Sequence, residues 1–304
     1  NITGSVATVS GDDLTDVASP NISNLLQGKV AGLDVSAGTG QPGQLPTIRI
    51  RGVSSIRSSR DPIWVVDGVI QHDTPRLNPQ DVESISVLKD ASSAALYGSR
   101  GANGVIVVTT RRAKEDGQTT ITFSSKTGAT AFNTGGFELM TGPELYDFWS
   151  TFGNQSGIPD WYTPDLLNTD TDWQHLGTQT GLIQDYNLSI NGNSGKTSLF
   201  SALNYFKEDG SVKGMSFERY AGRLNLDYKV TEKFTLQPKL AVTYSKTRDQ
   251  QHSLYGIYTN LPWDNPYDEA GNPVNAQAPG SGWRGRDLSN YLYDLQWNYS
   301  NNNV

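Results

Sequence analysis

Three glycines, Gly38, Gly40 and Gly43, have the spacing best suited to a chemical role, because they match the pattern G-x-G-x-x-G. In a dinucleotide-binding loop this pattern follows a strand and opens a helix, whose free amides meet the pyrophosphate. Here Pro42 lies inside the pattern, and a short strand at 48–51 is predicted after it. The pattern therefore indicates a flexible loop. The residues around it argue against a nicotinamide-dependent enzyme.

The segment that begins at Asn168 resembles the start of a calcium-binding loop, because Asp170 and Asp172 follow at alternate positions. However, Trp173 occupies the position that requires glycine, and Gln179 replaces the closing glutamate. We predict no cofactor, with calcium in this loop as the disfavoured alternative.

The chain contains no cysteine, which excludes disulfides, thiolate nucleophiles and iron–sulfur clusters. Its histidines are few and far apart in sequence: His72, His175 and His252. A histidine-based metal centre or a Ser/His/Asp triad is therefore disfavoured. The formal net charge is -7, without a basic patch suited to nucleic acid. We predict a protein that is not an enzyme and binds no nucleic acid.

Two long segments, 132–182 and 247–287, are rich in aromatic residues beside Asp and Asn. Aromatic faces can stack on sugar rings, while carboxylates and amides accept hydrogen bonds from hydroxyl groups. We name four candidate ligand-binding residues here: Trp161, Trp173, Trp263 and Trp283. Packing within the loops, or docking to a partner protein, is the alternative and the more common role of such residues.

The elements that would carry these loops are clearest at 219–245, where apolar even positions alternate with polar odd positions. Eleven residues at about 3.3 Å each, tilted by roughly 40°, rise about 27 Å, which matches the apolar thickness of a bilayer. Tyr220 and Tyr244 mark one end of the pair of runs, and Tyr228 and Phe234 mark the other. The pattern predicts a transmembrane β-hairpin with its turn at 231–233.

The charged residues decide which face of this hairpin meets lipid. A shift of one residue would place Arg223, Asp227 and Lys239 in hydrocarbon, where each Arg or Lys near the midplane costs roughly 2–4 kcal/mol. Even positions are therefore expected to face outward and odd positions to face a wet lumen. A soluble sheet with one solvated face shows the same alternation and is the alternative.

The rest of the second half repeats this pattern. We predict six strands, at 119–131, 183–191, 197–207, 218–230, 234–246 and 288–300. Short and long connections alternate between them, as in outer-membrane barrels with short periplasmic turns. Six strands leave an unpaired edge in lipid, so we expect a piece of a larger barrel.

The sequence contains no run of eighteen apolar residues, so no transmembrane helix is predicted. The first twenty residues carry no signal peptide, which suggests a mature or trimmed chain.

Residues 1–118 predict a compact mixed α/β domain. Helical spacing follows Pro20 and ends at Gly32, and a hairpin turn is expected at Asp67-Gly68. The segment 84–110 reads as a small βαβ-like unit, in which Asp90 begins a helix that runs to residue 97.

Six sequence motifs occur in this region in a fixed order. They are LQGKVAGL at 26–33, IRIRG at 48–52, WVVDGV at 64–69, NPQDVESI at 78–85, VLKDAS at 87–92 and ALYGSRGANGVI at 95–106. Together they resemble the plug domain of SusC/RagA-like TonB-dependent outer-membrane transporters. Further on, YNLSI at 186–190 and RYAGRLNL at 219–226 are similar to early barrel strands of that family. The resemblance covers roughly residues 3–250.

The resemblance implies an α+β plug domain at 1–118, followed at 119–304 by the first antiparallel strands of a 22-stranded transmembrane β-barrel. It also implies an outer-membrane location, with the plug inside the lumen and the long loops extracellular. A SusD-like lipoprotein and the TonB complex are the implied partners. The substrate would be an oligosaccharide or, as the alternative, an oligopeptide. The family's TonB-contacting segment precedes the plug and cannot be placed here.

The plug resemblance gives a role to a set of arginines: Arg49, Arg51, Arg100, Arg111 and Arg112. We expect them to pair with lumen-facing acids and hold the plug in place, with contact to a passing substrate as the alternative. Such hydrated pairs are individually weak. The leading hypothesis is active nutrient import, and a soluble glycan-binding β-domain is the hypothesis from a different class.

Overall fold

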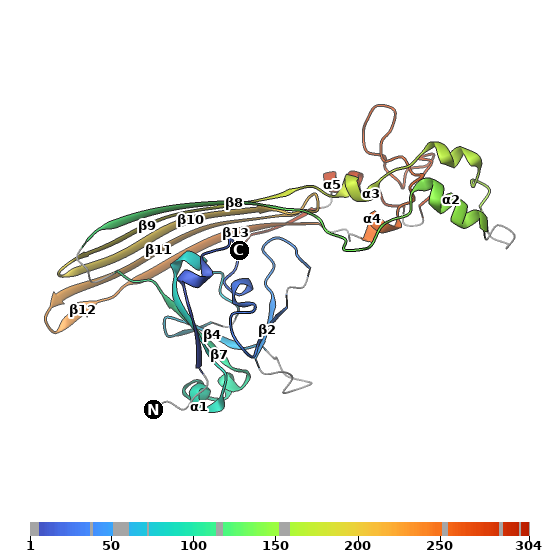
Figure 1. Ribbon diagram of the computed structural model, residues 1–304. Coiled ribbons are helices and arrows are strands. Elements are labelled where there is room, and N and C mark those ends of the chain that lie inside the picture. Colours follow the sequence, from blue (N-terminus) through green and yellow to red (C-terminus); the bar gives the residue numbers. More distant parts are fainter. Residues whose placement is uncertain are drawn as a thin grey trace.

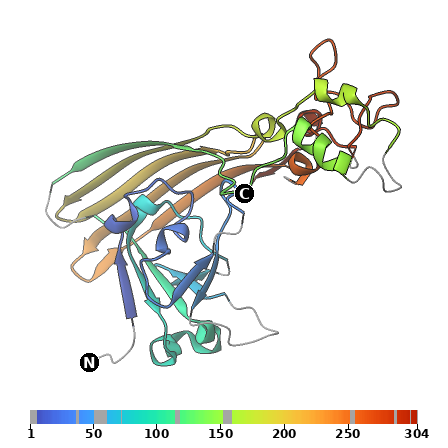
Figure 2. The ribbon, with the colours of Figure 1, turned by 45° about the vertical axis from the view of Figure 1, so that its right-hand side comes forward.

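The computed structural model describes residues 6–36, 39–50, 61–71, 73–113, 118–151, 159–250, 255–285, 288–297 and 299–303. In Figures 1 and 2 the first part of the chain lies against one face of a long antiparallel sheet. We call the described residues of 6–113 the N-terminal unit and the long sheet the wall.

The N-terminal unit is built on a five-stranded sheet with the order β1-β6-β7-β4-β5. Its strands are β1 (Val6–Ser10), β4 (Ile63–Val66), β5 (Val69–Gln71), β6 (Val82–Leu88) and β7 (Val105–Thr110). A separate two-stranded sheet consists of β2 (Leu33–Ser36) and β3 (Thr47–Ile50). The helical segments are short: η1 (Asp12–Leu14), η2 (Asn24–Leu26), η3 (Pro79–Asp81), α1 (Ala91–Ala94) and η4 (Ala95–Asn103). Fully buried side chains such as Leu26, Val82, Ile85 and Ile106 form its core.

Several local predictions for this unit are confirmed, and two are wrong. Asp67 and Gly68 both have positive φ, as a tight hairpin turn between β4 and β5 requires. Asp90 caps α1 by accepting a hydrogen bond from the Ser93 amide at 2.8 Å. The helix expected after Pro20 is only the single turn η2. Strands β6 and β7 pair antiparallel, so 84–110 is not a βαβ unit; β7 instead runs parallel to β4.

The wall contains seven antiparallel strands, in the order β14-β13-β11-β10-β9-β8 with β12 also paired to β11. They are β8 (Thr120–Thr130), β9 (Gly181–Ser194), β10 (Thr197–Asp209), β11 (Ser216–Thr231), β12 (Phe234–Leu236), β13 (Lys239–Gln250) and β14 (Tyr299–Asn303). The predicted strand 234–246 is divided because Pro238 has no N–H to donate to Leu226, although its carbonyl still accepts from the Leu226 amide at 3.1 Å.

The strand predicted at 288–300 is wrong. Residues Tyr291–Trp297 form the helix α5, and β14 begins only at residue 299. Tyr291, Leu292 and Leu295 lie at helical spacing and pack on the cluster around Trp173 and Ile257. This tertiary packing prevails over the period-two pattern of aromatic residues in the same segment.

The two faces of the wall differ as predicted from the alternation. On the outer face, Leu203 and Val242 are exposed by 62% and 60%. On the inner face Arg219, Arg223 and Asn225 are buried beneath the N-terminal unit. No helix or second sheet covers the outer face among the described residues.

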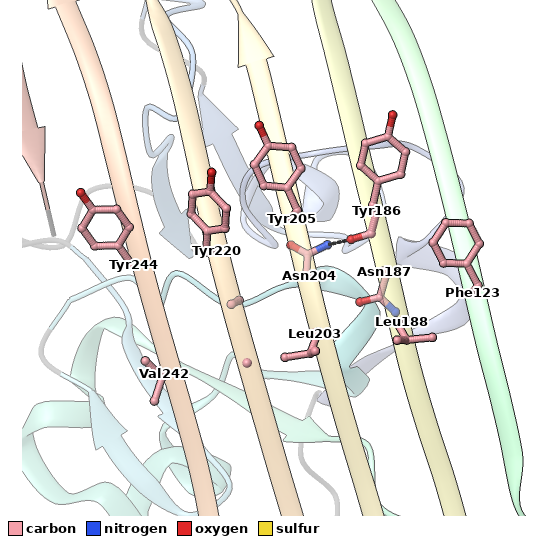
Figure 3. Close-up of a pocket in the computed structure, with 12 residues that line it drawn as sticks. Phe123, Tyr186, Asn187, Leu188, Leu203, Asn204, Tyr205, Tyr220, Val242 and Tyr244 are labelled. Carbon is pink, nitrogen blue, oxygen red and sulfur yellow. Dashed lines mark hydrogen bonds between the residues drawn. The ribbon is translucent and has the colours of Figure 1, made fainter.

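An aromatic row crosses this outer face at one level (Figure 3). Its members are direct partners on four adjacent strands: Tyr186, Tyr205, Tyr220 and Tyr244. Adjacent ring centroids lie between 5.0 and 6.4 Å apart. Beside the row, Gly222 leaves a shallow apolar groove of about 560 Å³ between Leu203 and Val242. Such rows are typical of the membrane–water boundary of transmembrane strands.

The described residues of the long connections 131–180 and 251–298 fold together beyond one end of the strands, and we call these connections the loop cap (Figures 1 and 2). The loop cap holds α2 (Gly142–Thr151), η5 (Pro164–Asn168), α3 (Trp173–Gly177), α4 (Tyr255–Thr259) and α5. Within the described ranges, no helix has the length and apolar character needed to cross a membrane.

Candidate functional site: a polar seam between the N-terminal unit and the wall

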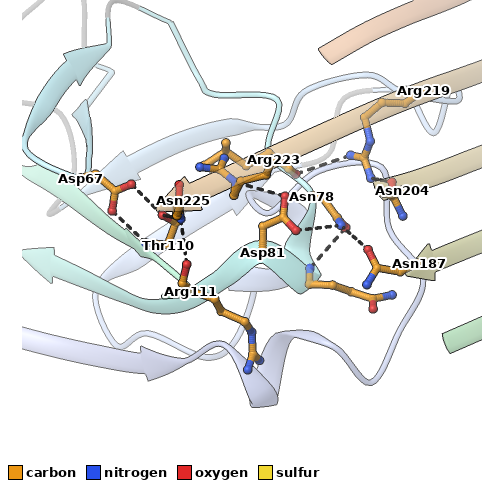
Figure 4. A network of polar contacts seen from close by, with 12 residues as sticks. Asp67, Asn78, Asp81, Thr110, Arg111, Asn187, Asn204, Arg219, Arg223 and Asn225 are labelled. Atoms are coloured by element: carbon orange, nitrogen blue, oxygen red, sulfur yellow. Dashed lines mark hydrogen bonds and ion pairs between the residues drawn. The ribbon is translucent and has the colours of Figure 1, made fainter. Parts of the chain in front are cut away.

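The most unusual feature of the molecule is the contact between the N-terminal unit and the wall, which is polar although it is buried (Figure 4). Inward positions of β9, β10 and β11 place a set of polar side chains there: Asp185, Asn187, Asn204, Arg219, Arg223 and Asn225. All are at most 7% exposed. We call this contact the seam. Buried polar groups require partners, and most of these side chains find one in the N-terminal unit, whereas Asn204 pairs with Asp185 and Arg219 of the wall itself.

One ion pair lies at the centre of the seam. Arg223 Nε lies 3.2 Å from Asp81 Oδ2, and both side chains are less than a tenth exposed. Asp81 ends η3, whose first turn is capped by Asn78, and Pro79 follows the cap. Burial raises the pKa of Asp81, and the charge and hydrogen bond of Arg223 only partly oppose this rise. The pair therefore does not fully compensate the cost of burying the carboxylate.

Amide side chains on both sides extend the seam. Asn78 Nδ2 donates to Asn187 Oδ1 at 2.9 Å, which joins η3 to β9. Gln80 accepts a hydrogen bond from Ser124 Oγ on β8 at 2.8 Å and lies 3.4 Å from Asp185 Oδ2. These contacts link residues more than forty positions apart in the sequence and hold η3 against β8 and β9 of the wall.

Arg219 is fully buried and acts mainly through main-chain carbonyls. Its guanidinium donates to the carbonyls of Pro20 and Leu77 in the N-terminal unit and to Asn204 Oδ1 on β10, the last at 3.0 Å. The guanidinium carbon also lies 5.4 Å from the centroid of the Phe206 ring, a cation–π distance. Arg219 therefore joins two separate segments of the N-terminal unit to the wall.

A second group of contacts lies near the end of β7. Asn225 Nδ2 donates to the carbonyl of Arg111 at 2.8 Å, and Lys239 Nζ lies 3.5 Å from Asp67 Oδ2. Burial alone would raise the pKa of Asp67, but hydrogen bonds from Thr110 and the charge of Lys239 hold that pKa below its ordinary value. Asp67 is thus an acceptor for both its own unit and the wall.

The loop that contains the glycine pattern makes a third group of contacts. Glu208 on β10 accepts a hydrogen bond from the backbone amide of Gly43. Gly43 has φ +72°, and a Cβ atom at this position would overlap the ring of Phe217, which is 1% exposed. Gly43 is therefore required for close approach to the wall, and no helix follows the loop. Gly38 lies outside the described residues.

The seam combines many separate hydrogen bonds and ion pairs with buried apolar side chains such as Phe206 and Phe217. Contacts that water can replace contribute on the order of 1 kcal/mol or less each. The buried Asp81–Arg223 pair is different, because removal of one partner costs about 3–5 kcal/mol. Together these contacts hold the N-terminal unit in place, and water entering the seam can satisfy the same polar groups after separation. In chemical terms, the described groups of the seam can bind the N-terminal unit and release it.

Of the predicted arginines that the structure describes, only Arg111 contacts the wall in the seam. Arg111 contributes its carbonyl, while its guanidinium pairs with Asp12 of its own unit at 2.5 Å. Arg49, Arg100 and Arg112 are exposed and, within the described part of the chain, none of them pairs with an acidic side chain. Arg51 lies outside the described residues. The ion pairs have the opposite polarity to the one expected, because the wall supplies the cations and the N-terminal unit the acids.

The four candidate tryptophans lie in the loop cap, away from the seam. Trp173 and Trp263 are 2% and 1% exposed, and their indole N–H groups donate to the carbonyls of Leu261 and Gly142. Buried faces cannot stack on a ligand, so the ligand-binding expectation is corrected for these two residues. Trp161 and Trp283 are half-buried. Among the described residues, no cluster of His, Asp or Glu is arranged to hold a metal ion.

Comparisons with known proteins agree with this architecture. Residues 1–105 match the family model described as TonB-dependent Receptor Plug Domain. The chain is 35% identical over 289 residues to TonB-dependent receptor P26 of Formosa agariphila, covering 90% of this chain and 28% of that protein. It is 30% identical over 316 residues to TonB-dependent receptor SusC of Bacteroides thetaiotaomicron, covering 99% and 30%.

The same likeness holds among solved structures. The structure of the RagAB peptide transporter superposes with a TM-score of 0.81 at 28% identity, covering 94% of this chain and 36% of that one. The chain thus spans about 30% of the length of the curated relatives it matches.

Proposed function

Because the chain belongs to the SusC/RagA-like family of TonB-dependent transporters, we propose that it plugs and partly walls an outer-membrane channel for large nutrients. In this proposal residues 1–118 are the plug and residues 119–304 are the first strands and loops of the barrel. A SusD-like lipoprotein covers the loop cap side, and the TonB complex acts from the periplasm. Oligosaccharides are the proposed substrates.

The seam is the observation that supports this proposal most directly. Beside its apolar contacts, this interface contains the ion pairs Asp81–Arg223 and Asp67–Lys239 and a series of amide contacts. Force applied to the N-terminal unit can break such contacts one after another while water replaces them. Partial unfolding or displacement of the plug would then open a path through the lumen.

The membrane location leads to a prediction about the wall. Leu240 faces outward and is 59% exposed, whereas Thr243 on the same strand faces inward. Leu240→Arg is expected to destabilise the intact protein in lipid bilayers by about 2–4 kcal/mol, because the charge enters hydrocarbon. Thr243→Arg is the control, since its side chain lies on the inner face opposite Ala221. Folding into vesicles over a urea series measures the difference. Equal effects of both substitutions would contradict a lipid-facing outer surface.

Two substrate classes are candidates for this channel. The loop cap offers aromatic and acidic groups, which suit neutral sugars. Peptides are the second candidate, because the RagAB proteins are described as a peptide importer and the chain superposes closely on them. A soluble glycan-binding domain fits poorly, since Leu203, Val242 and the other outward apolar side chains remain uncovered.

The test is uptake by cells that express the intact protein, with and without collapse of the inner-membrane proton gradient. Labelled oligosaccharides and labelled oligopeptides are supplied separately, and a strain lacking the gene corrects for other routes. We expect gene-dependent oligosaccharide uptake that stops when the gradient collapses. Uptake that continues unchanged would refute energy-driven import, and uptake of peptides alone would replace the proposed substrate class.

A further inference from the structure

The loop cap is a folded unit with its own hydrogen bonds. Its two segments are joined where the Thr171 amide donates to the Pro262 carbonyl at 2.8 Å and Trp263 Nε1 donates to the Gly142 carbonyl at 3.2 Å. Around Trp263 lies a cluster of four further aromatic rings: Tyr146, Trp149, Trp161 and Tyr162. The buried tryptophans therefore make the cap rigid enough to carry a preformed cavity.

Such a cavity lies between the segments 134–145, 170–174 and 258–262, with a volume of about 780 Å³. This is within the range of small-molecule sites, which is roughly 300–1,000 Å³. Phe137 and Tyr258 meet edge to face at 5.8 Å and give it an aromatic surface. Phe137 is 56% exposed, so its ring is available to a ligand.

The side-chain amide nitrogen of one residue that lines this cavity lacks a hydrogen-bond partner among the described residues. Asn260 is 8% exposed, and its side-chain Nδ2 is buried without a partner among the described residues. No side-chain partner for its Oδ1 occurs there either, so rotation of the carboxamide can present a donor or an acceptor to the cavity without breaking a bond. An unpaired buried amide is unfavourable, and a ligand that pairs with it relieves this cost.

The charges around the cavity select against anions. Its lining contains three acids, Glu138, Asp170 and Asp172, and no Lys or Arg among the described residues. The loop cap as a whole carries twelve Asp and Glu but only two Arg in sequence, although the entire chain has a net charge of only -7. The negative field of this surface repels polyanions at distances of up to about a Debye length, roughly 8 Å.

We propose that this cavity is a capture site for the end of an uncharged oligosaccharide. The apolar face of one sugar ring packs on Phe137 and Tyr258, and its hydroxyl groups donate to the rim carboxylates. A hydroxyl group can both donate and accept, so it matches either orientation of the Asn260 carboxamide. The site excludes sulfated and uronic-acid sugars by charge. This inference rests on the proposed function and assigns its substrate contact to a definite place.

The test is calorimetric binding to the intact protein in nanodiscs. The probes are neutral malto-, cello-, xylo- and mannotetraose, tetragalacturonate as the acidic sugar, and a tetrapeptide rich in lysine. We expect a neutral tetrasaccharide to bind, and Asn260→Ala and Phe137→Ala each to weaken it about tenfold or more. Phe137 is exposed, so its variant keeps the fold even if the Asn260 variant does not. Asn168→Ala is the matched control, because Asn168 is exposed and outside the cavity.

Three outcomes would overturn the assignment: no neutral tetrasaccharide binds, the acidic sugar or the peptide binds in preference, or Phe137→Ala binds as the parent does. Gradient-dependent uptake by the same variants separates this inference from the proposed function. If gradient-dependent uptake is unaffected by Phe137→Ala, only the cavity assignment is contradicted. If the parent protein binds the tetrasaccharide but shows no gradient-dependent uptake, the transport proposal is contradicted and the cavity assignment is not.

Discussion

Gly43→Ala is expected to make the outer membrane leaky to large molecules. A methyl group at this position overlaps the Phe217 ring, which is buried in the wall and cannot move aside easily. The backbone at φ +72° adds a cost of roughly 1–2 kcal/mol for any residue with a Cβ atom. The loop must therefore leave the wall, and the hydrogen bond from the Gly43 amide to Glu208 is lost with it.

Gly40→Ala is the matched control for this substitution. Gly40 has a nearly equal φ of +69°, but a Cβ atom there would have no neighbour within 4 Å. The two variants thus share the backbone cost and differ only in the overlap with the wall. The measurement is growth inhibition by an antibiotic too large for ordinary porins, at matched amounts of folded protein in the membrane. If Gly43→Ala cells are no more sensitive than Gly40→Ala cells, the loop does not seal against the wall.

Arg223→Ala is expected to loosen the plug more than removal of the whole ion pair does. The single substitution leaves the Asp81 carboxylate buried without its cationic partner, which costs about 3–5 kcal/mol. Arg219 lies close enough to act on the charge of Asp81 and offsets part of this cost. In the double variant Arg223→Ala, Asp81→Ala no buried charge remains, so part of the loss is recovered.

Hydrogen exchange of the β6 and β7 amides in the intact protein measures this effect. Strand β6 begins directly after Asp81, and β7 ends directly before Arg111. We expect faster exchange in Arg223→Ala than in the double variant, with the parent slowest. The wall strands β9 and β10 serve as the internal reference. Equal exchange in the single and double variants would show that Asp81 and Arg223 are not coupled.

Local patterns in the sequence predicted the wall well and the seam poorly. The alternation at 219–245 fixes register and faces, because it depends only on neighbours along the strand. The same rule failed at Tyr291–Trp297, where packing on Trp173 and Ile257 favours a helix. Odd positions such as Arg223 were recognised as inward-facing. Their partners were not, because Asp81 is 142 positions away and nothing local identifies it.

The site residues show the same limit. Arginines in the first region were expected to hold the plug, yet the cations that reach across the seam are Arg219, Arg223 and Lys239 on the wall. One feature of the sequence did point to these cations: an arginine that faces inward on a wall strand requires a buried partner. Likewise, aromatic composition could not separate Trp263, which holds the loop cap together, from Phe137, which faces its cavity.

If the plug must leave the wall for transport to occur, a reversible cross-link between the two will stop uptake. The chain has no cysteine, so Asn78→Cys with Asn187→Cys places a single thiol pair across the seam, where the native side chains meet at 2.9 Å. A short bifunctional thiol reagent can close the pair if the sulfurs do not meet. Leu203→Cys with Gly222→Cys is the control, because it joins two strands within the wall.

We predict that closing the 78–187 bridge in the intact protein stops gradient-driven uptake and that reduction restores it, while the 203–222 bridge has no effect. Continued uptake through a transporter whose 78–187 bridge is fully closed would contradict the account.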